Sequence, residues 1–209
     1  MNKYKFLIYL SVLFCTALVV SNIIAGKLYA APFGVVLTSA VWLFPIVYII
    51  GDVLPEVYGL EVTKKIIWLG FFANIFAVAF FSLTLILPFP SFFEGQGAFQ
   101  TVLGFTPRLL LASFCAYLVG TNSNAWVLVQ IKRMTKGRWL WMRTIGSTLV
   151  GESLDSAIFI MIAFFGIVPA IALPSMILAQ AVFKTSYEIL ATPLTYVVIA
   201  WFKKAEGLG

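Results

Sequence analysis

Several ionisable side chains occur inside long apolar stretches of the chain, where an ionised group is costly. Six of them form three pairs, Asp52 with Glu56, Glu152 with Asp155, and Lys184 with Glu188. A spacing of three or four residues places both members of a pair on one helix face. An ionised side chain at the centre of a membrane helix costs at least about 2.5 kcal/mol on insertion scales. Each therefore needs a partner, a hydrated cavity or a function.

Carboxylates outnumber the bases that could neutralise them. The acids in these stretches are Asp52, Glu56, Glu152, Asp155 and Glu188, and the nearby bases are Lys27, Arg143 and Lys184. Surplus carboxylates in a low dielectric must be protonated, hydrated or matched by something that enters from outside. We therefore predict a ligand or proton site. The alternative is a set of ion pairs that only hold helices together, as Lys184 and Glu188 could do within one turn.

Side-chain amides also fall in or near the apolar stretches, namely Asn22, Asn74, Asn122, Asn124, Gln130 and Gln180. An amide offers both donors and acceptors, so amides beside acids predict a cavity for a flat, hydrogen-bonding solute. Tyr48, Phe159 and Tyr187 could stack on such a solute. The alternative for each amide is a hydrogen bond that ties two helices together, worth about 0.6 to 2 kcal/mol.

The composition indicates the elements that must position these groups. Of 209 residues, 62% are apolar, 11% are charged and none is histidine, and the mean hydropathy is +1.02. So few charges cannot cover a soluble globule, which excludes a soluble enzyme, and histidine catalysis and histidine metal sites are excluded outright. Cys15 and Cys115 are interpreted as packing residues. We expect no metal and no cofactor.

Apolar runs of about 20 residues predict an all-α, polytopic membrane protein with six transmembrane helices in one domain, residues 1–209. The predicted spans are Tyr4–Gly26, Val35–Tyr58, Ile66–Leu87, Pro107–Ile131, Trp141–Gly166 and Pro174–Phe202. Pro45, Gly51 and Pro55 interrupt the second span, which predicts a broken helix bearing acids, a frequent substrate-site device. A simple kink is the alternative.

Basic residues are concentrated on one side of these spans, which predicts that both termini face the cytoplasm. That side holds Lys3, Lys5, Lys64, Lys65, Lys132, Arg133, Lys136, Arg138, Lys203 and Lys204. The loop from residue 87 to 106 on the other side has Glu94 as its one charge. We interpret the cluster from Lys132 to Arg138 as a topology signal rather than a nucleic-acid site.

Three stretches carry a resemblance to a known family. Ser-Asn-Ile-Ile-Ala-Gly-Lys (21–27), Asp-Val-Leu-Pro-Glu-Val-Tyr-Gly (52–59) and Gly-Glu-Ser-Leu-Asp-Ser-Ala-Ile-Phe (151–159) are similar to the queuosine precursor transporter family, formerly grouped with vitamin uptake transporters. The similarity runs from about Phe6 to Lys203. It implies a multi-pass importer in the bacterial inner membrane for 7-cyano-7-deazaguanine, 7-aminomethyl-7-deazaguanine or queuine. The residues carried over are Asn22, Lys27, Asp52, Glu56, Glu152 and Asp155.

The chemistry of a deazaguanine fits these residues independently. One carboxylate can accept both the ring N–H and the exocyclic amino group, and an amide or lysine can donate to the carbonyl. We expect Glu152 or Asp155 at this edge, and Asp52, Glu56 or Glu188 at a cationic tail or a coupling proton. The full predicted binding set is Asn22, Lys27, Asp52, Glu56, Asn74, Asn122, Glu152, Asp155, Phe159, Gln180, Lys184 and Glu188.

Alternatives to a stand-alone secondary importer stay open at this stage. The chain has the size and helix number of substrate-binding subunits of energy-coupling-factor vitamin transporters. It has no phosphate-binding loop, so any ATP dependence would need a partner protein. An intramembrane enzyme fits poorly, because Glu152 and Asp155 lie on one helix rather than two, and we predict no enzymatic activity. A purely structural membrane protein is a further alternative. The expected partners are the lipid bilayer and a small molecule, with no nucleic acid, and a homodimer is compatible with the sequence.

Overall fold

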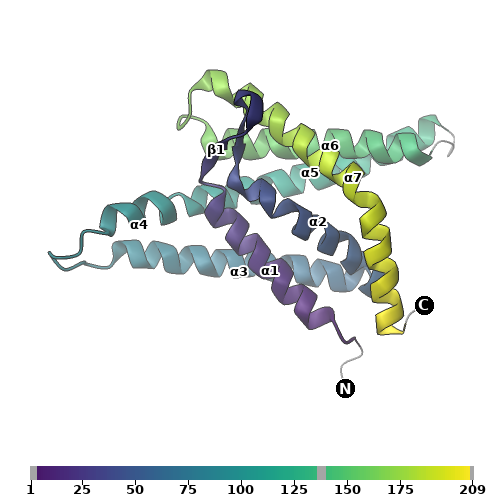
Figure 1. The fold of residues 1–209 in the computed structure, drawn as a ribbon, viewed down its shortest axis with the longest axis horizontal. Coiled ribbons are helices and arrows are strands. Elements are labelled where there is room, and N and C mark those ends of the chain that lie inside the picture. The colour runs from purple at the N-terminus through teal and green to yellow at the C-terminus, as the bar shows by residue number, and fades with distance from the viewer. Residues whose placement is uncertain (1–3, 136–139, 208–209) are drawn as a thin grey trace. The chain divides into compact units, whose positions relative to one another are not determined.

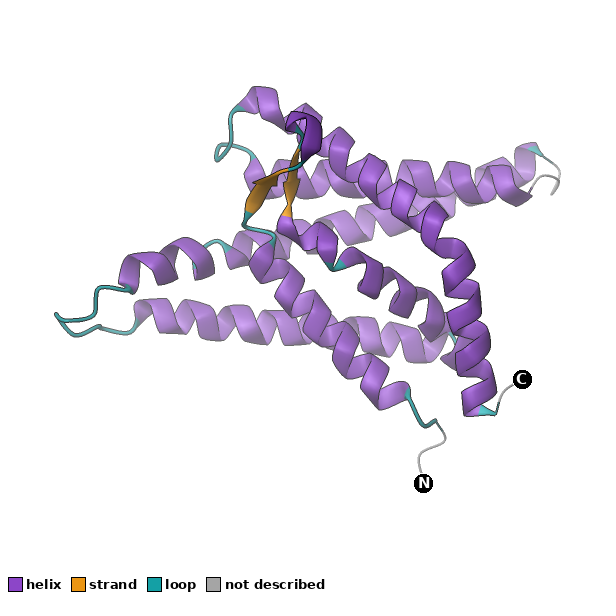
Figure 2. Cartoon of the chain, viewed as in Figure 1, coloured by secondary structure: helices purple, strands orange, loops and turns teal. Residues whose placement is uncertain are grey.

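The computed structural model describes residues 4–135 and 140–207, without the side chains of residues 33 and 140–144, and it is predominantly helical (Figures 1 and 2). Lys3, Lys136 and Arg138 of the predicted basic side, and the side chain of Arg143, lie outside the described residues. The main elements are α1 (Leu7–Ile24), β1 (Leu28–Ala30), β2 (Val36–Thr38), α2 (Phe44–Val53), α3 (Leu60–Ile86), α4 (Gln96–Leu103), α5 (Thr106–Met134), α6 (Leu140–Phe164) and α7 (Leu173–Glu206).

The chain forms two compact units, each assembled from separate stretches of sequence. Unit 1 comprises Met1–Gly26, Ser39–Thr106 and Tyr187–Gly209, and unit 2 comprises Lys27–Thr38 and Pro107–Ser186. The long helix α7 therefore contributes its first part to unit 2 and its second part to unit 1.

Unit 1 has a hydrophobic core between α1, α2 and α3. Leu10 and Phe14 of α1 are buried against Val53 and Ile66. Helices α1 and α3 approach closely at Gly70, where an added Cβ would lie 2.7 Å from Cδ1 of Leu18. Small residues permit such approaches between membrane helices.

A π-helical turn, Leu54–Tyr58, follows α2 without a break and contains Pro55. Proline has no N–H to donate, and wide turns of this kind occur frequently at functional sites. The turn ends at Gly59, whose φ of +85° is a left-handed conformation that favours glycine. The amide of Gly59 donates to the carbonyl of Pro55 at 3.1 Å. Asp52 and Glu56 thus flank the junction between α2 and the π-helical turn.

Unit 2 packs α5, α6 and the first part of α7 with a small β-hairpin, drawn in orange in Figure 2. Strands β1 and β2 pair antiparallel, with Tyr29 opposite Leu37. Helices α5 and α6 meet at Gly120 and Gly151, and an added Cβ on Gly151 would lie 3.1 Å from the carbonyl oxygen of Gly120. The two backbones are therefore in direct contact.

Five of the six predicted spans contain a long helix at nearly the predicted position, and the second does not. The stretch from Val35 to Tyr58 begins with strand β2 and a 3₁₀ helix (Ser39–Trp42), so α2 starts only at Phe44. The ten residues of α2 and the five of the π-helical turn that continues it are together fewer than the roughly 20 residues of a spanning helix. The stretch is therefore not one continuous helix as predicted, and its helical part begins at Phe44. Helix α4 also lies in a connection for which no helix was predicted.

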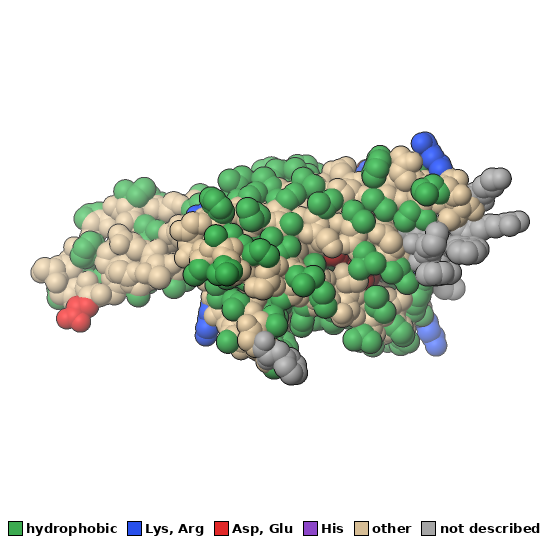
Figure 3. All heavy atoms as spheres, turned by 90° about the horizontal axis from the view of Figure 1, so that it is seen from above, with side chains coloured by type: hydrophobic (Ala, Val, Ile, Leu, Met, Phe, Trp, Pro, Cys, Tyr) green, Lys and Arg blue, Asp and Glu red, His purple; other side chains and the backbone are tan. Residues whose placement is uncertain are grey.

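Among the described residues, four helical segments are long and apolar enough to cross a membrane. These are Leu7–Ile24, Leu60–Ile86, Gln96–Met134 and Ile145–Phe164. Large apolar side chains are exposed along them, as Phe72, Phe76 and Phe80 of α3 illustrate at 64%, 65% and 52% exposure. Hydrophobic side chains are spread over the face seen in Figure 3. Such an exterior suits lipid and not water. Six spans and cytoplasmic termini remain predictions.

Candidate functional site

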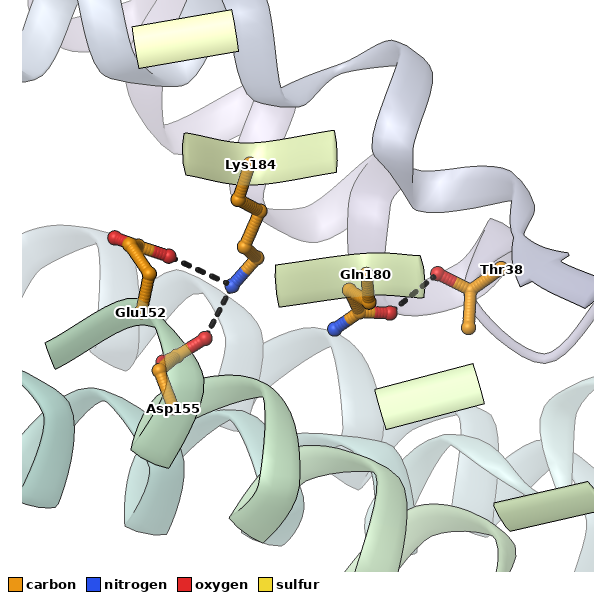
Figure 4. Close-up of polar contacts among 5 residues, drawn as sticks. All are labelled: Thr38, Glu152, Asp155, Gln180 and Lys184. Atoms are coloured by element: carbon orange, nitrogen blue, oxygen red, sulfur yellow. Dashed lines mark hydrogen bonds and ion pairs between the residues drawn. The ribbon is translucent and has the colours of Figure 1, made fainter. Parts of the chain in front are cut away.

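A buried lysine in unit 2 lies between two carboxylates of a neighbouring helix. Lys184 of α7 is 5% exposed, and its Nζ lies 3.4 Å from Oε2 of Glu152 and contacts Oδ2 of Asp155 more closely still. Figure 4 shows the ammonium group between the two acids of α6. The structure thus pairs Lys184 with the acids of α6.

Helical spacing and a close helix contact place these acids. Glu152 and Asp155 are three residues apart on α6, so both side chains leave the same face. Behind that face, Cβ of Asp155 packs over Gly120 of α5, where an added Cβ would lie only 2.8 Å from it. The absence of a side chain at position 120 is therefore what allows Asp155 its position.

The cluster has an excess of acceptors over donors. Its described members are two carboxyl groups and one ammonium group, and the acid side chains are 20% and 22% exposed while that of Lys184 is 6% exposed. Each carboxylate has two oxygens with several lone pairs, and one ammonium cannot occupy all of them. The exposed acid edges can therefore accept N–H donors from a ligand.

Unit 2 contains further buried polar groups on β2, α5, α6 and α7. Gln180 lies one turn before Lys184 on α7 and is 1% exposed, and its Oε1 accepts a long hydrogen bond of 3.5 Å from Oγ1 of Thr38 (Figure 4). In the part of the chain that the structure describes, Oγ of Ser156 and Oδ1 of Asn124 are buried without a hydrogen-bond partner. Thr38 and Ser156 were not predicted, because a hydroxyl in an apolar run commonly bonds its own helix.

The predicted amides of helices α1 and α3 pair with each other. Nδ2 of Asn22 donates to Oδ1 of Asn74 at 2.6 Å, and Nδ2 of Asn74 donates to the carbonyl of Gly70 at 2.9 Å. Both side chains are buried in unit 1. This arrangement is the helix-tying alternative that the sequence left open for these two residues.

For three other predicted residues, Asn122, Phe159 and Lys27, the structure describes contacts or exposure but no bond to the ion cluster. Asn122 is exposed on α5 and donates to the carbonyl of Leu118 in its own helix. Phe159 is buried and meets Phe164 edge to face at 6.3 Å. Lys27 is exposed between α1 and β1. The structure brings none of them into contact with the carboxylates through a bond that it describes.

The remaining predicted acids, Asp52, Glu56 and Glu188, belong to unit 1. Glu56 is 59% exposed at its side chain and lies 3.3 Å from Nζ of Lys203. The sequence argument counted only three nearby bases and omitted Lys203, so its surplus of carboxylates was overestimated by one. Asp52 is exposed on α2.

The fold and the site define a class, that of multi-pass membrane proteins with an ion cluster between two of their helices. The family described as "Putative vitamin uptake transporter" matches residues 38–198, and the chain belongs to this family, whose curated relatives are named queuosine precursor transporters. No solved structure matches the chain.

Three relatives show how far the similarity extends. The probable queuosine precursor transporter of Bacillus subtilis is 30% identical over 166 residues, covering 78% of this chain and 72% of the relative. The queuosine precursor transporter of Escherichia coli is 27% identical over 78% of this chain and 71% of the relative. The probable queuosine precursor transporter of Haemophilus influenzae is 27% identical over 58% of this chain and 49% of the relative.

Proposed function

We propose that this protein imports 7-deazaguanine precursors of queuosine across the bacterial inner membrane, and that Lys184, Glu152 and Asp155 bind the base. The family and the printed names of the relatives support the substrate class. The ion cluster in a helix long enough to cross the membrane supports an internal binding site. An enzymatic role has no support from these relatives.

The assignment of the binding residues rests on one observation. The ammonium of Lys184 lies directly beside the carboxylate of Asp155. Together the two groups present acceptor, acceptor and donor side by side. The guanine-like edge of a 7-deazaguanine presents the complement: an exocyclic amino group, a ring N–H and a carbonyl oxygen. A carboxylate accepts the first two and the ammonium donates to the third. Glu152 then holds Lys184 in place as the second acid.

For the predicted acids outside this cluster we propose a role in proton coupling, as the sequence analysis suggested. Asp52 and Glu188 carry a coupling proton during transport. Glu56, paired with Lys203, is the weakest candidate of the three. We further propose that the chain works as a stand-alone secondary transporter without nucleic-acid partners, with a homodimer as the expected oligomer.

Uptake by cells that lack their own importer tests the assignment. Radiolabelled 7-cyano-7-deazaguanine and 7-aminomethyl-7-deazaguanine are supplied to cells that express wild type, Asp155→Asn, Glu152→Gln or Glu61→Gln. Glu61 is a matched control, because it is 83% exposed and pairs with Lys64 one turn along its own helix. We expect at least tenfold lower uptake per folded protein for Asp155→Asn and unchanged uptake for Glu61→Gln.

Two results would overturn parts of this proposal. Wild-type uptake equal to that of empty cells rejects the substrate class, and full uptake by both site variants rejects the site. Purified protein in liposomes tests the stand-alone mechanism, because transport there requires no added ATPase. Transport that appears only with an energy-coupling module would instead establish a substrate-binding subunit.

A further inference from the structure

Ser156 of α6 carries a hydroxyl that is buried without a described hydrogen-bond partner. The residue is 0% exposed, and among the described residues nothing bonds to its Oγ. A hydroxyl on a helix commonly donates to a carbonyl of the preceding turn, as Ser82 and Thr192 do at 2.8 and 2.6 Å. Since an unmade hydrogen bond is costly in a buried place, the Ser156 hydroxyl requires an explanation.

A second buried donor lies on α7. Gln180 is 1% exposed, and the one hydrogen bond that the structure describes for it is the long one, 3.5 Å, that its Oε1 accepts from Thr38. In Figure 4 its amide nitrogen points away from Thr38, toward the side on which Lys184 and Asp155 lie. Within the described part of the chain, the N–H groups of Nε2 therefore have no acceptor.

Both donors lie one helical turn from the ion cluster and in the same direction. Ser156 follows Glu152 by four residues on α6, and Gln180 precedes Lys184 by four residues on α7, so each shares a helix face with a member of the cluster. Residues 165–172 join the two helices, and a short connection of this kind makes neighbouring helices antiparallel. A forward step along α6 and a backward step along α7 thus lead the same way. The two donors follow the ion pairs within unit 2.

The chemistry of these two groups indicates what they can bind. A hydroxyl and a primary amide are uncharged donors, and a neutral acceptor can bind both. In a 7-deazaguanine the substituent at position 7 is next to the carbonyl around the rim of the base. A base whose carbonyl meets Lys184 can therefore direct this substituent toward the next turn of both helices. A nitrile there ends in a neutral acceptor nitrogen, whereas an aminomethyl group would bring a second positive charge beside Lys184.

We propose that the hydroxyl of Ser156 and the amide N–H of Gln180 donate to a neutral acceptor next to the carbonyl of the base, and so select the 7-cyano precursor. The identity of the base and its contact with Lys184 rest on the proposed function. A site with buried donors discriminates against a ligand that leaves them unpaired. The ion cluster binds the edge that all these precursors share, and the donor pair, Ser156 and Gln180, determines which substituent is preferred.

Two probes of the same shape isolate the contribution of the acceptor. 7-Cyano-7-deazaguanine and 7-ethynyl-7-deazaguanine have the same guanine-like edge and a linear substituent of similar size, but only the nitrile ends in an acceptor. Their affinities for the purified protein are measured by ligand-dependent thermal stabilisation. The variants are Ser156→Ala and Gln180→Leu. Ser153→Ala is the matched control, because Ser153 is an exposed serine on the same helix.

We expect wild type to bind the nitrile about tenfold more tightly than the ethynyl probe. Ser156→Ala and Gln180→Leu should each lose most of this preference and bind the ethynyl probe as wild type does, and Ser153→Ala should match wild type for both. Without ligand, Ser156→Ala should melt at the wild-type temperature or above it, because the variant has no unpaired hydroxyl. Where Gln180→Leu does not fold, Gln180→Met replaces it.

The outcomes distinguish this inference from the function on which it rests. If wild type binds both probes equally, or if both variants keep the preference for the nitrile, the donor pair is rejected and the proposed function stands. Tighter wild-type binding of 7-aminomethyl-7-deazaguanine than of the nitrile also rejects the pair. If Ser156→Ala lowers the melting temperature without ligand and weakens both probes equally, the hydroxyl supports the fold and does not select the substituent. If wild type binds none of the probes, both proposals fall together.

Discussion

Lys184 lies between two carboxylates inside unit 2. Its replacement should therefore lower the stability of the folded protein strongly. Its side chain is 6% exposed, and the acids are 20% and 22% exposed. Removal of one member of a buried ion pair leaves an uncompensated charge, which costs about 3 to 5 kcal/mol. Since the carboxylates keep some access to solvent, the lower end of that range applies.

We therefore predict that Lys184→Met destabilises the protein by about 3 kcal/mol at neutral pH. Adding Asp155→Asn to Lys184→Met should restore part of this loss, because it removes one of the two repelling charges. Thermal unfolding in detergent of the single and double variants measures the coupling between the two sites. Lys64→Met is the control, since the Lys64–Glu61 pair is exposed and contributes little. Additive effects of Lys184→Met and Asp155→Asn would contradict the assignment.

Part of the site could be predicted at the level of single residues. The spacing of Glu152 and Asp155 defines a shared face from the helix period alone, and the need of a buried acid for a partner points to Lys184. The choice between Glu188 on the same helix and the acids of α6 depends on tertiary packing. The Glu56–Lys203 pair joins residues 147 positions apart, for which no local pattern gives a signal.

Among the helices, composition was sufficient for α1, α3, α5, α6 and α7, since each is a long apolar run. It failed between Val35 and Tyr58, because a uniformly apolar run has no periodicity that separates strand from helix. The strand β2 forms there because β1 precedes it and pairs with it. That pairing is a contact between segments and cannot be read from either segment alone.

The contact of α5 with α6 depends on glycine. An alanine methyl at position 120 would meet Cβ of Asp155 at 2.8 Å and the carbonyl oxygen of Gly151 at 3.2 Å, so the helices would have to move apart. We predict that Gly120→Ala destabilises the protein by about 1 to 3 kcal/mol and lowers deazaguanine uptake per folded molecule. Melting temperature and uptake are the two measurements.

The matched control is Gly97→Ala on α4, where an added Cβ would meet no described atom within 4 Å outside its chain neighbours and the backbone of its own helix. It should leave stability unchanged or raise it slightly, because alanine favours helix more than glycine does. Equal stability and uptake for both alanine variants would show that α5 and α6 are not in close contact at Gly120.

The ends of α1 and α7 in unit 1 are joined by one carboxylate. Glu206 accepts the backbone N–H groups of Lys5 and Phe6 at 2.7 and 2.8 Å and the hydroxyl of Tyr58 at 2.8 Å. Burial tends to raise the pKa of the Glu206 carboxyl, but the hydrogen bonds from Phe6, Lys5 and Tyr58 outweigh it and lower the pKa. The carboxylate also satisfies amides at the start of α1.

A lowered pKa fixes the sign of a pH effect. The folded state holds the ionised form, so its stabilisation is complete above the ordinary pKa of about 4.3 and is lost as the pH falls through the lowered folded value. We predict that Glu206→Gln lowers stability by about 0.3 to 1 kcal/mol at pH 7 and that this difference from wild type disappears in acid. Melting curves of both proteins across this pH range test it. A difference that stays constant down to about pH 3 would exclude a contribution from the charge of Glu206.

For the molecule as a whole, the contacts of Glu206 limit which side of the membrane each terminus can occupy. Glu206 near one terminus bonds to Lys5 near the other, and both lie at Tyr58, immediately before α3. The 27 residues of α3 then extend about 40 Å, more than the thickness of a bilayer core. If α3 crosses the membrane, the termini share one side and the loop from residue 87 to 106 lies on the other. Because Lys64, Lys65, Lys203 and Lys204 lie at that end, we predict that the side of the termini is cytoplasmic.

We therefore predict that a green fluorescent protein fused to either terminus fluoresces in the cytoplasm, whereas alkaline phosphatase fused after Glu94 is active outside the inner membrane. Phosphatase fused after Lys204 should be inactive, because that enzyme folds only outside the cytoplasm. Replacing Lys203 and Lys204 by Gln is a further variant, since the contacts of Glu206 should keep the C-terminus with the N-terminus even when the charge signal there is weakened. Active phosphatase at one terminus and not at the other would mean that the Glu206 contacts do not form in the membrane, because they cannot join groups on opposite sides of a bilayer.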